Sequence, residues 1–112
     1  MAILRGVLSL LVLALLAACG ESVLSMDDAT AAGFRPTQEK IYGMVGAIDG
    51  AGGPWREGEH IEIYVYDRKS AISDQTRRFF PGLSYTTTRE HQNLVIVCRT
   101  MATCDSVVAA LR

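Results

Sequence analysis

Two stretches of the chain have the hydrophobic pattern of β-strands. Between His60 and Asp67 the side chains alternate, so Ile61, Ile63 and Val65 fall on one face of an extended segment. Residues 93–98 are mostly apolar on both faces, which is typical of a strand in the middle of a sheet. The pattern therefore predicts one half-exposed strand and one central strand.

Helix signals surround these strands. Ser25 and Asp28 have the spacing of a capping box, and Gly33 is suited to end the short helix that follows. A longer helix is predicted over residues 68–80, because a Pro-Gly pair comes directly after it. A last helix is expected after the central strand, with a threonine as its cap.

The segment after Pro36 carries conflicting signals. Thr37 is a good N-cap residue, and four apolar residues follow at helical spacing: Ile41, Met44, Val45 and Ile48. Two glycines within the segment would each destabilise a helix by about 1 kcal/mol relative to alanine. The spacing nevertheless favours a helix over a strand.

The glycine-rich stretch Asp49–Pro54 predicts a turn. It lacks the lysine of a phosphate-binding loop, and one aspartate is a poor set of calcium ligands. Residues 55–56 and 57–59 are expected to form a short strand and a hairpin turn that lead into the strand at His60. Residues 85–88 are β-prone and fit an edge strand or an extended loop.

Together these elements predict one α+β domain over residues 25–112. The sheet is expected to be small and antiparallel, with three or four strands, and the helices are expected to pack mainly on one face. A chain of 112 residues has room for one such domain.

The N-terminus differs in composition from this domain. Arg5 precedes an apolar run over residues 6–18, which is shorter than the roughly 20 residues that a membrane-spanning helix needs. A charged start, a short apolar core and a small-residue end are typical of a secretory signal peptide. The signal ends in Leu16-Ala17-Ala18-Cys19, which resembles the lipobox of bacterial lipoproteins.

The resemblance implies a lipid anchor. The signal would be cleaved between Ala18 and Cys19, the Cys19 thiol would be joined to diacylglycerol and its amino group would be acylated. Residues 19–24 would then be a lipidated cysteine with a short tether. One acyl chain binds a membrane only reversibly, whereas two or three hold a protein firmly. Gly20 stands where an aspartate tends to retain such proteins at the inner membrane, so a periplasm-facing anchor in the outer membrane is favoured.

The remaining sequence is loosely similar to small uncharacterised bacterial lipoproteins in the stretches "GAIDG", "IEIYVYD" and "NLVIVC". This likeness implies no particular activity. Removal of the signal would leave ten basic and twelve acidic residues, a balance that gives no indication of nucleic-acid binding.

Cys98 and Cys104 remain as a possible pair. Their spacing matches neither a zinc site nor a C-x-x-C redox motif. In an exported chain they are expected to form a disulfide that fastens the last helix to the central strand, and two free buried thiols are the alternative.

Signals for catalysis are weak. His60 and Glu62 share a strand face, which permits an acid–base or metal pair, although an exposed polar sheet face explains the pattern equally well. His91 is expected in a loop, and no serine-nucleophile motif or zinc ligand set is present. We therefore expect a non-catalytic domain that holds no metal or cofactor.

Three aromatic residues are candidates for an exposed patch that binds another envelope protein: Trp55, Tyr64 and Tyr66. The sequence thus favours a lipid-anchored envelope protein with an interaction or accessory domain. The alternative is a carrier or sensor of a small ligand, bound in a cleft between the helices and the sheet.

Overall fold

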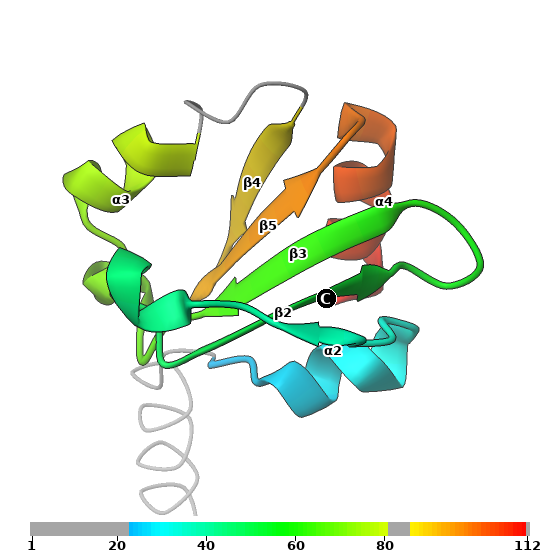
Figure 1. The fold of residues 1–112 in the computed structure, drawn as a ribbon, viewed down its shortest axis with the longest axis horizontal. Coiled ribbons are helices and arrows are strands. Elements are labelled where there is room, and N and C mark those ends of the chain that lie inside the picture. Colours follow the sequence, from blue (N-terminus) through cyan, green and yellow to red (C-terminus); the bar gives the residue numbers. More distant parts are fainter. Residues whose placement is uncertain (1–22, 81–85, 112) are drawn as a thin grey trace, which may run out of the picture.

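The computed structural model describes residues 23–80 and 86–111. These residues form a five-stranded antiparallel sheet in the order β1-β2-β3-β5-β4 (Figure 1). The strands are β1 (Gln38–Glu39), β2 (Asp49–Pro54), β3 (His60–Val65), β4 (Thr87–His91) and β5 (Leu94–Cys98). The α+β class and the antiparallel sheet are confirmed, but the sheet has more strands than the three or four expected.

Three α-helices and two 3₁₀ turns flank the sheet in the described part of the chain. They are α2 (Met26–Ala32), α3 (Asp74–Phe79), α4 (Met101–Ala110), η1 (Tyr42–Val45) and η2 (Lys69–Ala71). The start of α2 is as predicted, because Ser25 Oγ accepts a hydrogen bond from the Asp28 amide and the Asp28 carboxylate accepts one from the Ser25 amide. Gly33 ends this helix at φ 122°, a conformation that favours glycine.

The sheet is covered on both faces. The longer helices, α2 and α4, pack on the face that carries Ile61, Ile63 and Ile96. The opposite face carries Tyr64 and other buried residues, and η1, η2 and α3 cover it. Helices were expected mainly on one face of the sheet, but η1, η2 and α3 form a second layer on the other face. It is visible in Figure 1 as α3 and α4 on opposite sides of β4 and β5.

The helix predicted after Pro36 does not form. The chain instead pairs with β2 as the short strand β1 and then turns through η1. Gly46 ends η1 in the left-handed region at φ 76°. Of the four residues at helical spacing only Val45 is buried, since Ile41 and Met44 are each 77 % exposed and Ile48 is 58 % exposed.

The stretch Asp49–Pro54, predicted as a turn, is instead the strand between β1 and β3. Its glycines allow close approach of other segments. A Cβ built on Gly53 would lie 1.9 Å from the carbonyl oxygen of Arg35, and one on Gly50 would lie 2.8 Å from Cβ of Tyr42. The glycines are thus required by packing across the sheet rather than by a turn.

Three other boundaries differ from the predictions. Trp55 makes an isolated bridge to Phe34 rather than a strand, and the hairpin turn follows it. The helix predicted over residues 68–80 is divided into η2 and α3, because Ser73 caps α3 with its side chain. β4 extends past Thr88 and pairs along its length with β5. Residues 81–85, which include the predicted helix stop, lie outside the described part.

Asn93 joins three segments at one end of the sheet. Its side chain is fully buried, and its Oδ1 accepts a hydrogen bond of 2.7 Å from the Leu24 amide. Its Nδ2 donates to the carbonyl oxygens of Leu24 and Tyr66, both at 2.8 Å. The N-terminal segment is thereby held against the ends of β3 and β5.

We predict that Asn93→Ala lowers the free energy of unfolding by at least about 2 kcal/mol, because backbone groups of Leu24 and Tyr66 lose their partners in a buried place. Urea unfolding followed by circular dichroism measures the change. Gln38→Ala removes an exposed amide in β1 and should alter stability by less than about 0.5 kcal/mol. Equal stability of the two variants would contradict this role of Asn93.

Candidate functional site

The lipobox residues lie outside the part of the chain that the structure describes. These are Leu16, Ala17, Ala18 and Cys19, so the cleavage and the lipidation stay predictions. Among residues 23–80 and 86–111, no helix is long and apolar enough to cross a bilayer.

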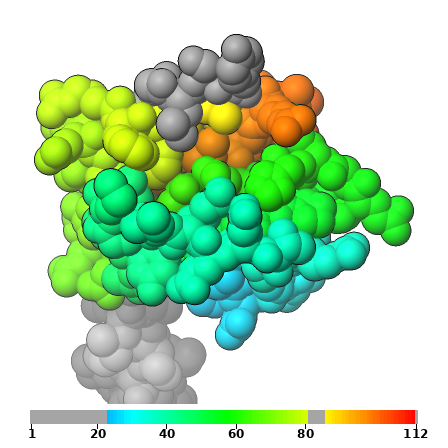
Figure 2. Space-filling model, viewed as in Figure 1, coloured from blue at the N-terminus to red at the C-terminus, as the bar shows by residue number. Residues whose placement is uncertain are grey.

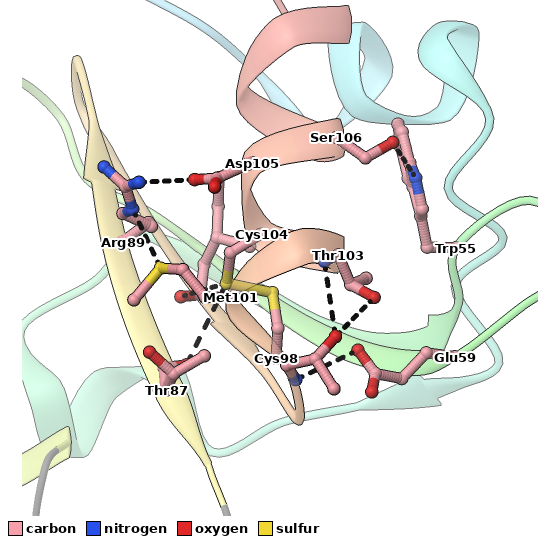
Figure 3. Close-up of a disulfide and its surroundings, with 12 residues drawn as sticks. Trp55, Glu59, Thr87, Arg89, Cys98, Met101, Thr103, Cys104, Asp105 and Ser106 are labelled. Carbon is pink, nitrogen blue, oxygen red and sulfur yellow. Dashed lines mark hydrogen bonds and ion pairs between the residues drawn. A yellow bond between two sulfur atoms is a disulfide. The ribbon is translucent and has the colours of Figure 1, made fainter.

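Cys98 and Cys104 form the expected disulfide, with Cα atoms 5.7 Å apart. Cys98 is the last residue of β5, and Cys104 lies near the start of α4 (Figure 3). Both residues are at least 99 % buried. Thiol–disulfide exchange requires access to sulfur, so this bridge is structural rather than reactive.

Side-chain contacts reinforce the same junction between the sheet and α4. Thr100 caps the helix by accepting a hydrogen bond from the Thr103 amide. Figure 3 shows three further contacts around the bridge: Glu59 with the Thr100 amide, Arg89 with Asp105, and Trp55 with Ser106. These contacts, like the disulfide, connect the start of α4 to the sheet.

His60 and Glu62 lie on one strand face beside Lys40. The Lys40 Nζ atom is 2.9 Å from Glu62 Oε1, and Tyr64 Oη donates to Glu62 Oε2 at 3.1 Å. A Cβ built on Gly52 would lie 3.0 Å from His60 Nε2 and 2.9 Å from Lys40 Cε, so both side chains lie over this glycine. Glu62 is thus held by an ion pair with Lys40 and a hydrogen bond from Tyr64.

The two tyrosines of this face have raised pKa values. Burial is the larger cause of the increase in the pKa of Tyr64, and the negative charge of Glu62 adds to it. Burial also raises the pKa of Tyr66, whose hydroxyl donates to the Val45 carbonyl oxygen at 2.9 Å. Both phenols are therefore neutral under ordinary conditions and act as hydrogen-bond donors.

An open cleft of about 300 Å³ lies beside the disulfide. It is lined by His60, Ile61, Glu62, Thr86, Val97, Cys98 and Arg99. His91 is not near it, since this residue ends β4 with its Nε2 3.3 Å from the carbonyl oxygen of Leu111. In the described residues no three His, Cys, Asp or Glu side chains are placed to hold a metal ion together.

The exposed aromatic patch expected from the sequence is not formed. Trp55 is 5 % exposed, Tyr64 is 8 % exposed and Tyr66 is fully buried. Trp55 belongs to the core on one face of the sheet, whereas the two tyrosines belong to the core on the other. The strand face that the alternation assigned to solvent is covered by η1, η2 and α3, so this prediction was wrong.

A different apolar surface is exposed instead. An open groove of about 350 Å³ lies between η1 and α3, and we call it the η1–α3 groove. Met44, 77 % exposed, and Phe79, 50 % exposed, are apolar side chains in its lining. The other lining residues are Gly43, Val45, Gly46, Ala71, Ser73, Gln75 and Thr76.

The sequence interpretation missed this groove because it placed Met44 on the apolar face of a helix, whereas the structure exposes it in η1. One signal was present, since Met44 stands between two glycines that disfavour a helix. An apolar residue in a glycine-rich turn is placed at the surface more readily than one in a core helix.

No protein-family model, no curated protein and no solved structure matches this chain. The functional argument therefore rests on the geometry of the groove and the cleft.

We predict that the double variant Cys98→Ala/Cys104→Ala is less stable than the wild type by about 2.4 kcal/mol, the chain-entropy value for so small a loop. Urea unfolding of both proteins measures this difference. The wild-type cysteines should also resist alkylation of the folded protein until a reductant is added. Rapid labelling of both thiols without a reductant would show that the bridge does not form.

We predict a loss of stability above about pH 10, the unperturbed pKa of tyrosine. The folded state raises the pKa of Tyr64, so at high pH the unfolded state releases a proton that the folded state retains. The free energy of unfolding then falls as the pH rises. Tyr64→Phe should make this decline shallower in urea unfolding between pH 9 and 12, a range taken from the same reference pKa. An unchanged slope would exclude Tyr64 as its source.

Proposed function

We propose that this chain is a bacterial envelope lipoprotein, anchored through acyl chains on Cys19, whose domain is a non-catalytic interaction module. The observation that carries the proposal is the exposed apolar surface around the η1–α3 groove. Six large apolar side chains are exposed in the described residues, and two of them, Met44 and Phe79, line this groove. Figure 2 shows the η1 segment and α3 on one face of the molecule.

The groove is held in shape before any partner binds. The Val45 carbonyl oxygen, in η1, accepts hydrogen bonds from Tyr66 Oη at 2.9 Å and from Thr76 Oγ1 at 3.0 Å. These two bonds connect η1, the end of β3 and α3. A preformed surface loses little conformational entropy on binding, which favours recognition of a partner.

The chemistry of the groove suits a short apolar segment of another protein. Met44 and Phe79 offer apolar contact, and methionine adapts its shape to different partners. Ser73, Gln75 and Thr76 supply polar groups beside them. Protein interfaces combine such an apolar centre with a polar rim.

A small-ligand carrier or sensor is the second candidate. The cleft beside the disulfide favours it, because Ile61 and Val97 provide apolar surface while His60 and Arg99 stand at its border. Such a cleft would take a small ligand with an apolar body and an anionic group. Dependence of binding on Arg99, with the groove variants below unaffected, would favour this candidate over the interaction module.

The test of the proposal is chemical crosslinking in the native envelope followed by mass spectrometry. Wild-type protein should yield a crosslinked envelope partner, and Met44→Ser/Phe79→Ser should reduce that yield at least tenfold, since interface anchors of this kind contribute more than about 1.4 kcal/mol. Arg78→Ser is the matched control, because Arg78 is exposed on the same helix and does not line the groove. Equal loss in both variants would contradict binding at the groove.

The anchor is tested in the same cells by labelling with an alkyne-bearing fatty acid. Wild-type protein should carry the label, and Cys19→Ser should remain unlabelled and change its fractionation. Membrane fractionation of Cys19→Ser identical to that of the wild type would exclude the anchor, whatever the result at the groove.

A further inference from the structure

Several chain segments meet at the end of the sheet where Asn93 lies, and we call it the Asn93 end. The N-terminal segment is bound there through the Leu24 hydrogen bonds to Asn93. The connection from η1 into β2 reaches the same end, because the Ile48 amide donates to the Val65 carbonyl oxygen at 2.8 Å. The connection from β3 into η2 begins there as well, since Val65 pairs with Leu94.

These segments expose apolar side chains. Val23 is 55 % exposed and Ile48 is 58 % exposed, and both stand beside residues that the hydrogen bonds fix at the Asn93 end. Ile41, 77 % exposed, comes from the same connection between β1 and β2 as Ile48. An apolar surface of this kind in an isolated domain indicates contact with another phase or molecule.

Basic side chains accompany the apolar ones. Arg68 and Lys69 come three and four positions after the last residue of β3, and both are exposed. Arg68 is paired with Asp67 at 3.4 Å, an exposed ion pair that contributes little to stability. Lysine and arginine beside exposed aliphatic residues are typical of surfaces that bind anionic lipid headgroups.

The position of Cys19 sets which part of the domain stands near the membrane. Leu24 is five positions after Cys19 in the sequence, so the two Cα atoms can be at most about 18 Å apart. Leu24 is fixed to Asn93, which places the Asn93 end within that reach of the lipidated residue. The opposite end of the sheet, where β5 finishes and α4 begins, carries one exposed large apolar residue, Met101, which is 47 % exposed.

We propose that the Asn93 end rests on the phospholipid bilayer, with Val23, Ile41 and Ile48 at the headgroup region and Arg68 and Lys69 against anionic headgroups. This inference rests on the proposed lipid anchor at Cys19. The short tether and the apolar contacts together give the domain one orientation on the membrane. The η1–α3 groove then lies beside the bilayer and open to the periplasm.

The experiment uses the full lipidated chain in vesicles of phosphatidylcholine and phosphatidylglycerol that contain a phospholipid with a photoactivatable headgroup. After illumination, mass spectrometry should find lipid adducts on Val23, Ile41 and Ile48 at least tenfold more often than on Met101. Met101 is the matched control, because it is an exposed apolar residue at the far end of the sheet. Arg68→Gln and vesicles without phosphatidylglycerol should each lower the adduct yield.

Other results would overturn the inference. Adducts that are as frequent on Met101 as on Ile48 would show a domain with no fixed orientation. Protection of Ile41 and Ile48 by a protein partner in native envelopes, with no lipid adducts there, would assign this surface to that partner. The acyl group on Cys19 is read from the same spectra: its absence removes the anchor and the inference together, whereas its presence without adducts at the Asn93 end overturns the inference alone.

Discussion

The antiparallel pairing of β3 with β5 is the constraint on which both layers of the domain depend. The register sets Ile63 opposite Ile96 and Tyr64 opposite Val95. A slip of one residue would exchange the two faces of β3, so the isoleucines would meet η1 and α3 while the tyrosines met α2 and α4. Tyr66 also holds the Val45 carbonyl oxygen. The shape of the η1–α3 groove is therefore decided by strand pairing in the centre of the sheet.

Local chemistry in the sequence was enough to predict the features that depend on neighbouring residues. These include the cap at Ser25, the strands β3 and β5 and the disulfide after β5. Prediction failed over residues 37–54, where glycines suggested a weakened helix and a turn. Gly53 is needed because the backbone at Arg35 passes over it, and such a tertiary contact leaves no local pattern. The groove was missed for the same reason, since the exposure of Met44 follows from that rearrangement.

Polar groups within the domain are mostly committed to structure. Glu62 binds Lys40 and Tyr64, Asn93 binds the N-terminal segment, and the disulfide is buried beneath the start of α4. Apart from Met101, the large exposed apolar residues of the described chain lie around η1, α3 and the Asn93 end. Exposed apolar side chains of this kind fit a domain that binds other molecules through its surface. The two proposed contacts, with a protein partner and with lipid, lie on adjoining surfaces.

The strand β1 has a consequence for copies that share one membrane. With the proposed anchor at Cys19, copies would diffuse in two dimensions and collide more often than the same number of chains in free solution. An open sheet edge would let colliding copies join into a continuous sheet. β1 offers only two residues, Gln38 and Glu39, and the exposed Glu39 carries a charge. Pro54, at the end of β2 beyond the reach of β1, has no amide hydrogen to donate. The short edge strand thus limits pairing between the sheets of neighbouring copies.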